Sequence, residues 1–185
     1  MIINLGAGKK LIENAINVDV TAYPGMQQVV DLSVFPWPWE DNSIDGIHAS
    51  HIAEHFFDQQ KFFNECCRIL KPEGFLRIVA PHSSCITSIG CLGHYRTYSY
   101  NTFNDYLAKD FYMFKTKRFE TTYQRLNWWY ESIDQEGNLS KPIRLVISLL
   151  NPFMSFLINL YPQVYENVFA GVIQCREVIW EGIKK

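Results

Sequence analysis

A glycine turn near the start of the chain is the first sequence feature with a chemical use. Residues 2–5, Ile-Ile-Asn-Leu, lead into Gly6-Ala7-Gly8. Glycine adopts backbone angles that a side chain would block, and it lets the main chain approach a bound molecule closely. Eleven residues after Gly8, Asp19 ends a second apolar run, where a carboxylate can accept hydrogen bonds from ribose hydroxyls. A short glycine turn also occurs without a ligand, so its meaning depends on its surroundings.

Histidine supplies the second set of candidate functional groups. The chain has five, and all except His48 are expected at strand ends or in the loops beside them. Because imidazole titrates near neutral pH, His51, His82 and His94 are candidate general bases. His51 and His55 are four residues apart and could share a helix face, where the alternative is that they pack or cap the helix start.

A paired histidine–cysteine pattern invites a metal interpretation. His82, Cys85, Cys91 and His94 are residue types that bind zinc, and they are arranged symmetrically. The gap between Cys85 and Cys91 is much shorter than the usual spacing between the two halves of a zinc finger. We therefore predict no metal site.

The elements that must position these residues alternate between short apolar runs and loops or helices. Strands are expected at 2–5, 16–20, 28–31, 44–49 and 75–80, with a helix from about 58 to 70. Residues 9–15 leave room for two helical turns at most. The alternation predicts a mostly parallel sheet, whose ligands bind beyond the carboxyl ends of its strands. The residues expected at that edge are Gly6, Gly8, Asp19, Asp31, Ser50 and His51.

The second half of the chain contains a long apolar segment. Residues 145–161 carry no charge and are almost enough to span a bilayer, but Asn151-Pro152 interrupts them. We expect one or two buried helices here, covering a pocket or a dimer interface. Contact with a membrane surface or a lipid-linked substrate is the alternative. A helix to about Lys109, a strand at 111–123, an exposed loop at 131–142 and a last strand near 174–181 complete the expectation.

Composition limits the classes of protein to consider. The 185 residues suit a single domain, 48% of them are hydrophobic and the net charge is −2. This charge gives no footprint for binding nucleic acid. The N-terminus lacks the basic leader of a signal peptide, and five cysteines without a disulfide pattern indicate a reducing, cytoplasmic setting.

Six segments, in order, resemble the class I S-adenosylmethionine-dependent methyltransferases of the type 11 group. They are residues 4–8, 17–19, 30–33, 35–45, 49–55 and 68–78. The resemblance implies one domain over 1–185, with a Rossmann-like, mostly parallel seven-stranded sheet of order 3-2-1-4-5-7-6. Its last strand would be antiparallel, and helices would cover both faces. Residues 1–80 would bind the cofactor and 81–185 the acceptor, with an apolar helical insertion at about 141–162.

The resemblance also implies S-adenosylmethionine as cofactor and S-adenosylhomocysteine as product. The turn at Gly6 and Gly8 would pass under the methionine part, and Asp19 would hold the ribose. Asp31 and Leu32 would flank the adenine. Ser50 and His51 would lie beside the sulfonium. Lys10 stands where the family often has a third glycine. The full set of implied cofactor residues is Leu5, Gly6, Ala7, Gly8, Asp19, Val20, Asp31, Leu32, Ser50, His51 and His55.

The sequence thus predicts transfer of a methyl group to an oxygen or nitrogen of a small-molecule or glycan-type acceptor. Residues 93–103, which are polar and aromatic, are the expected acceptor wall, unless they merely cap the sheet as a surface loop. A homodimer is a further expectation for the apolar segment. The rival from another class is a non-catalytic cofactor-binding scaffold whose aromatic C-terminal half contacts a partner.

Overall fold

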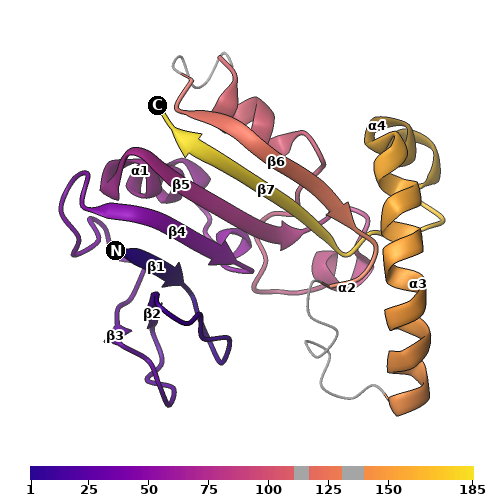
Figure 1. Cartoon of the computed structure of the whole chain (residues 1–185), viewed down its shortest axis with the longest axis horizontal. Helices are drawn as coiled ribbons and strands as arrows, with labels where there is room; N and C mark the ends of the chain where they lie inside the picture. Colours follow the sequence, from indigo (N-terminus) through magenta and orange to yellow (C-terminus); the bar gives the residue numbers. More distant parts are fainter. Residues whose placement is uncertain (111–116, 131–139) are drawn as a thin grey trace.

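A computed structural model describes residues 1–110, 117–130 and 140–185. Among these residues, seven strands form one sheet in the order β3-β2-β1-β4-β5-β7-β6 (Figure 1). Neighbouring strands from β3 to β5 are parallel, while β7 is antiparallel to both β5 and β6. The predicted strand order and direction are confirmed. The strands are β1 Ile2–Leu5, β2 Ile16–Asp19, β3 Gln28–Val29, β4 Ile44–Ser50, β5 Leu70–Pro81, β6 Phe119–Asn127 and β7 Glu177–Lys184.

Helix α1 covers Gln59–Ile69 and lies where the sequence predicts a helix. Asp58 is its N-cap residue, because the Asp58 side chain accepts a hydrogen bond from the backbone N–H of Lys61. The helix predicted after Asn101 is a π-helical turn. The strand expected over 111–123 begins at Phe119, and its first part, 111–116, lies outside the described residues. Most of the loop expected at 131–142 also lies outside them, at 131–139. The other helical elements are η1 Ala53–His55, α2 Ile86–Ile89, η2 Asn104–Ala108, α3 Lys141–Leu160, α4 Pro162–Val164 and η4 Tyr165–Phe169. Of these, α2 and η4 were not predicted.

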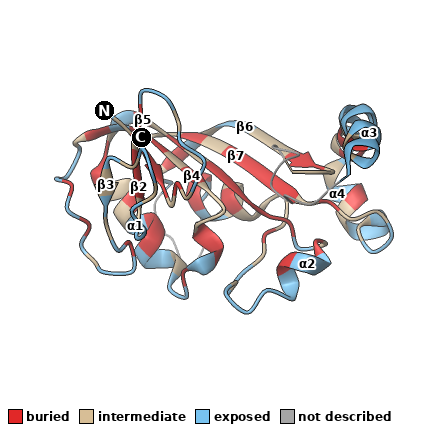
Figure 2. Cartoon of the chain, turned by 90° about the horizontal axis from the view of Figure 1, so that it is seen from below, coloured by how far each residue is buried: buried red, intermediate tan, exposed pale blue. Residues whose placement is uncertain are grey.

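The hydrophobic core lies on one face of the sheet. Successive strand residues point to opposite faces, so alternate positions of the central strands share this side. Phe62 and Cys66 of α1 are fully buried against it. Figure 2 shows α1 and α2 on the same side of the sheet. The strand residues in this core that are fully buried are Ile3, Leu5, Ile47, Leu76, Ile78 and Trp180.

The opposite face of the central strands is mixed: Val79 and Ile179 are buried on it, whereas several of its polar side chains are half-buried. His48 of β4 and Arg77 of β5 lie on it, and Arg77 forms an ion pair with Glu181 of β7. The described residues place no helix over this part of the sheet, so the expected cover on both faces is found on one face only (Figures 1 and 2). The reason lies in residues 9–15, which are too few for a crossover helix and form a loop instead.

Helix α3 stands beside the edge strand β6 and contacts it through a polar stripe. Asn151, Ser155 and Asn159 recur every fourth residue and therefore share one helix face. Asn159 accepts a hydrogen bond from the backbone N–H of Leu126 (2.9 Å) and donates one to its carbonyl (2.7 Å). Just beyond the end of β6, the backbone N–H groups of Trp128 and Trp129 donate to the side chains of Ser155 (3.0 Å) and Asn151 (3.1 Å), respectively. The helix thereby satisfies backbone groups that an edge strand leaves unpaired.

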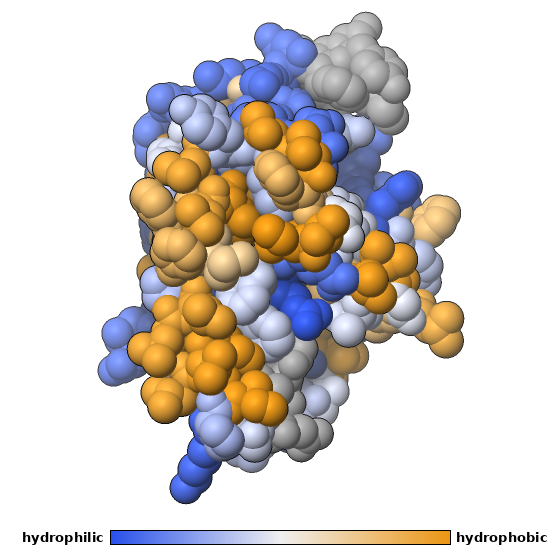
Figure 3. Space-filling view, turned by 90° about the vertical axis from the view of Figure 1, so that its right-hand side faces the viewer, coloured by the Kyte–Doolittle hydropathy of each residue, from blue (hydrophilic) through white to orange (hydrophobic). Residues whose placement is uncertain are grey.

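This orientation turns the apolar face of α3 outward. Only Ile147, Ser155 and Ile158 are buried in the helix, whereas Leu149, Phe153 and Phe156 expose more than half of their surface. Figure 3 shows the resulting apolar surface. The segment forms a single helix that continues through Pro152 and is not buried within the chain, so it does not cover the cavity. Its burial in a dimer interface stays a prediction. By length and composition the helix could cross a membrane.

Candidate active site

A cavity of about 990 Å³ opens at the carboxyl ends of β1 and β4, next to the start of β7. This is the edge at which the sequence predicted the site. Its wall combines the glycine turn with side chains from several other segments of the chain. The lining residues are Asn4, Gly6, Ala7, Gly8, Lys9, Lys10, Leu11, Ile12, Tyr23, His48, Ala49, Ser50, His51, Arg77, Val79, Ser88, His94, Tyr130 and Glu177.

The glycine turn is shaped to accept a ligand. Gly6 and Gly8 have φ angles of 62° and 52°, in the left-handed region that favours glycine. A Cβ atom on Gly6 would lie 2.7 Å from the side chain of Ile52, whereas one on Gly8 would meet nothing within 4 Å. The backbone at Gly8 therefore faces open space, as a cradle for an elongated cofactor requires.

Asp19 lies directly beside this turn. Its carboxylate accepts hydrogen bonds from the backbone N–H groups of Gly8 (2.9 Å) and Thr21 (3.0 Å). A carboxylate can accept about four hydrogen bonds, so these two leave capacity for ribose hydroxyls. The residues present therefore fit the ribose and methionine parts of S-adenosylmethionine.

A buried amide network holds the loop that replaces the crossover helix. Asn4 donates to the side chain of Asn17 (2.9 Å) and to the carbonyl of Lys10 (2.9 Å). Asn17 also accepts from the backbone of Ile12 at 2.8 Å. Sequence reasoning did not assign this role to either asparagine, although a polar residue within each apolar strand was a visible signal. The network fixes the cavity wall formed by residues 9–12.

His51 is held between two buried carboxylates. Its Nε2 donates to Glu177 (2.8 Å), and its Nδ1 lies 3.3 Å from Glu54 in an ionic contact; both glutamates are 0% exposed. Burial alone lowers the pKa of His51, but the hydrogen bond to Glu177 and the negative charges of both glutamates outweigh it and raise the pKa to about 9. Both ring nitrogens are engaged and protonated at neutral pH, so the geometry does not support the predicted base role for His51.

Glu177 is the functional residue that the sequence interpretation missed. It begins β7, lies 126 residues beyond His51 in the chain, and also accepts a hydrogen bond from Asn127 (3.2 Å). A single acid opening an otherwise apolar strand could have identified it. Its pairing with His51, however, depends on β7 lying next to β5.

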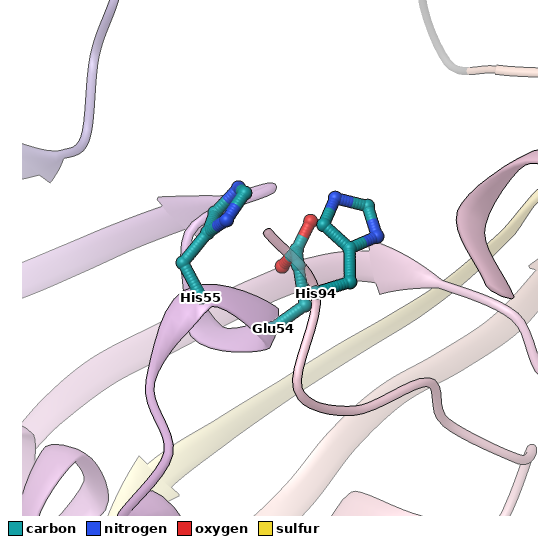
Figure 4. Close-up of side chains that lie close together, drawn as sticks. All are labelled: Glu54, His55 and His94. Carbon is teal, nitrogen blue, oxygen red and sulfur yellow. The ribbon is translucent and has the colours of Figure 1, made fainter. Parts of the chain in front are cut away.

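Three acid and histidine side chains cluster at one end of the cavity. They are Glu54, His55 and His94, whose potential ligand atoms all lie within 4.8 Å of one another (Figure 4). The rings of His55 and His94 meet edge to face, with centroids 4.9 Å apart. His94 lines the cavity as predicted, whereas His55, predicted to bind the cofactor, is not part of the cavity wall.

His82 lies away from the cavity, which corrects its predicted catalytic role. The residue is 1% exposed, its Nε2 donates to Glu166 (2.8 Å), and its Nδ1 accepts from the backbone of Ser84 (3.1 Å). Within the described part of the chain, His82, Cys85, Cys91 and His94 do not form a metal-ligand cluster. Folding therefore separates residues that the sequence pattern groups together.

The remaining predicted cofactor residues do not line the cavity. Leu5 and Leu32 are buried in the core, and Val20 is exposed. Asp31 is exposed at the end of the short strand β3, where hydrogen bonds from Ser33 lower the pKa of its carboxyl. Of the predicted set, Gly6, Ala7, Gly8, Ser50 and His51 form the cavity wall, and Asp19 contacts it through Gly8.

Comparison with known proteins agrees with this geometry. Residues 8–78 match the family model described as a methyltransferase domain. Proteins from two strains of Mycobacterium tuberculosis, named probable S-adenosylmethionine-dependent methyltransferases, are 31% identical over 75 residues. These matches cover 37% of this chain and only 27% of each relative.

Solved structures of the same fold cover the whole chain. A methyltransferase dependent on S-adenosylmethionine from Archaeoglobus fulgidus superposes with a TM-score of 0.59 at 16% identity, covering 100% of this chain and 85% of the other. The YcgJ protein of Bacillus subtilis gives 0.57 at 18% identity, covering 100% and 91%. The chain therefore has the fold of these S-adenosylmethionine-dependent methyltransferases, and its cofactor-binding half is similar in sequence to the methyltransferase domain family.

Proposed function

We propose that the protein transfers a methyl group from S-adenosylmethionine to an oxygen or nitrogen of a small-molecule or glycan-type acceptor. The observation that carries this proposal is the open backbone at Gly8, which lies beside Asp19 on the same cavity as His51 and His94. The cofactor supplies an electrophilic methyl group, so the protein mainly orients the reactants and excludes water.

Two histidines act at the acceptor end of the cavity. His51 is a positioning residue: clamped by Glu177, it holds the cavity wall where β4 meets the start of β7. His94 donates through Nδ1 to the carbonyl of Ser88 (3.1 Å), so its Nε2 carries a lone pair. That nitrogen can accept the proton of a hydroxyl acceptor.

The aromatic wall supports an acceptor with a flat or ring-shaped apolar face. Tyr23 and Tyr130 both line the cavity, and sugar or heterocyclic rings pack well against such side chains. With a net charge of −2, the chain offers nothing that attracts nucleic acid. The five free cysteines fit the reducing cytoplasm, which we propose as its compartment.

Calorimetric titration with S-adenosylmethionine and S-adenosylhomocysteine tests the cofactor. We expect micromolar binding to the wild-type protein and none to Asp19→Ala, because the ribose loses its acceptor. Asp105→Ala is the matched control, since this half-exposed carboxylate pairs only with Lys109 in the described residues and lies outside the cavity. Failure of folded, cofactor-free wild-type protein to bind millimolar ligand would refute the function.

Turnover separates an enzyme from a non-catalytic scaffold. We expect His94→Ala to bind cofactor normally but to lose methylation of any acceptor found in a broad screen. A wild-type protein that binds cofactor and methylates no acceptor across sugars, amines and phenols would favour the scaffold.

The exposed face of α3 narrows the acceptor class. From Leu145 to Gln163 the chain has no charged residue, while Lys141 and Arg144 stand at the start of the helix. The polar stripe of α3 is already bonded to β6, which leaves an apolar face with cations at one end. We propose that this face lies on an anionic bilayer surface and that the acceptor is lipid-linked.

Vesicle sedimentation tests the contact. Phe153→Ser/Phe156→Ser should lose binding to vesicles of mixed neutral and anionic lipid, while Ile86→Ser/Ile89→Ser, which removes two exposed apolar residues elsewhere, should bind normally. Wild-type protein that stays in solution as a dimer, and becomes monomeric in the α3 variant, would show that a second copy covers this face. A solved complex from Haloferax volcanii pairs a methyltransferase with its activator protein, at a TM-score of 0.55 to this chain.

A further inference from the structure

The cluster of Glu54, His55 and His94 has the composition of a metal site. Two imidazoles and a carboxylate are common ligands of zinc and related divalent ions. They come from two separate segments, η1 and the loop after α2, and Figure 4 shows their side chains gathered at one place. Their candidate ligand atoms lie within 4.8 Å of one another.

Both histidines donate a hydrogen bond through Nδ1 to a backbone carbonyl. The Nδ1 of His55 lies 2.8 Å from the carbonyl of Gly93, and the Nδ1 of His94 lies 3.1 Å from the carbonyl of Ser88. A carbonyl can only accept, so both Nδ1 atoms carry the proton and both Nε2 atoms have a lone pair. Histidines that bind metals are usually oriented in this way, with the second ring nitrogen donating to a backbone carbonyl or carboxylate.

The carboxylate of Glu54 lacks hydrogen bonds. The residue is 0% exposed, and within the described residues neither of its oxygens receives a hydrogen bond. Its one charged neighbour there is His51, with Nδ1 at 3.3 Å from a single oxygen. Burying a carboxylate without donors is costly, and such groups in proteins are normally paired or coordinate a metal.

We propose that Glu54, His55 and His94 bind a divalent metal ion, with zinc as the best match to this ligand set. Zinc ligands in a tetrahedral site lie roughly 3.4 Å apart, so the side chains would close inward on binding. Three protein ligands leave one coordination position open, which is typical of reactive zinc sites. Because His94 lines the cavity, the ion would lie next to the acceptor end.

The ion would change how an acceptor is activated, a consequence that rests on the proposed methyl transfer. An oxygen bound at the open position loses its proton more readily, because the metal lowers its pKa. With metal bound, the Nε2 of His94 is a ligand and no longer the proton acceptor. The binding itself requires neither cofactor nor acceptor, so it can be tested separately.

Metal titration of the untagged, chelator-treated full chain is the decisive experiment. We expect one equivalent of Zn²⁺ by calorimetry, and Co²⁺ to give the visible absorption of a site with nitrogen and oxygen ligands. His94→Ala and Glu54→Gln should each weaken Zn²⁺ binding by about a hundredfold, and His55→Ala by at least about tenfold. His55 is exposed, so its variant remains informative if Glu54→Gln fails to fold.

Two control variants distinguish this site from other ligands. Cys91→Ser removes the exposed thiol three residues before His94. His48→Ala removes a histidine from the open sheet face. Both variants should bind Zn²⁺ as the wild type does. Absence of metal binding by folded protein at millimolar Zn²⁺ would overturn the proposal. Binding that survives both His55→Ala and His94→Ala would overturn it as well. Either result leaves the cofactor titration unaffected, so the two proposals fail separately.

Discussion

Single residues at the strand ends decide whether the cavity can hold its cofactor. Gly6 and Gly8 share the left-handed backbone conformation, but their surroundings differ: a Cβ on Gly6 would strike Ile52, while one on Gly8 would project into open space. Substitution at Gly6 therefore damages the fold, whereas substitution at Gly8 should damage ligand binding more than folding.

Gly8→Ala tests this distinction. We expect a loss of stability of about 1 kcal/mol from the left-handed backbone, and a fall of about tenfold or more in affinity for S-adenosylhomocysteine, measured by calorimetry. Gly171→Ala is the control, because a Cβ there meets nothing within 4 Å and its φ is not left-handed. Unchanged affinity in Gly8→Ala would mean that the cofactor does not pass over this turn.

Glu177 anchors the other side of the cavity from within the core. Glu177→Ala leaves His51 and Asn127 without their shared acceptor, and breaking such a buried charged pair costs roughly 3 kcal/mol or more. Urea denaturation should show this loss. Glu181→Ala is the control. Glu181 lies four residues further along β7 and is half-exposed, so its loss should lower the free energy of unfolding by less than about 1 kcal/mol. Equal losses in the two variants would contradict the argument.

At the scale of elements, the pairing of α3 with β6 determines the exposed surface. A helix that uses its polar stripe to satisfy an edge strand must turn its apolar face away from the sheet. The same contact explains why Pro152 is tolerated, since the neighbouring Asn151 and Ser155 anchor this part of the helix to the strand end.

Asn159→Ala should weaken this docking. The change removes two hydrogen bonds to Leu126, each worth about 1 kcal/mol, so we expect a loss of about 2 kcal/mol in the free energy of unfolding. Asn167→Ala provides the comparison, because this exposed asparagine bonds only to Gln163 one turn earlier in the described residues. A loss no larger than that of the control would show that α3 is held by other contacts.

For the molecule as a whole, the open second face of the sheet makes stability depend on ligand binding. The loop at residues 9–15 is held by the amide network of Asn4 and Asn17 and forms part of the cavity wall. A ligand that binds only the folded state stabilises it by mass action.

S-adenosylhomocysteine at a hundredfold excess over its Kd should therefore add about 2.7 kcal/mol. For a chain of this size we expect a rise of about 5–10 °C in Tm, measured by differential scanning calorimetry. Asp19→Ala should show no rise at the same ligand concentration. A wild-type Tm that does not respond to ligand would contradict cofactor binding at this cavity.

The sequence by itself determined the sheet and the cofactor turn. Short apolar runs, each ending at a glycine, an acid or a histidine, are local signals, so the parallel strands, the Gly6–Gly8 turn and helix α1 could be predicted from them. The strand order was implied by the resemblance to the class I methyltransferases. Local spacing also misled, because His82 lies in the same loop region as His94 yet is buried away from the cavity.

Only the tertiary structure decided which distant residues meet. The antiparallel insertion of β7 between β5 and β6 brings Glu177 to His51, and the return of the loop after α2 brings His94 to Glu54 and His55. The orientation of α3 was equally undetermined, because a segment that is apolar almost all round does not show which face will be buried. Its three spaced polar residues acquire meaning only when the free edge of β6 lies beside them.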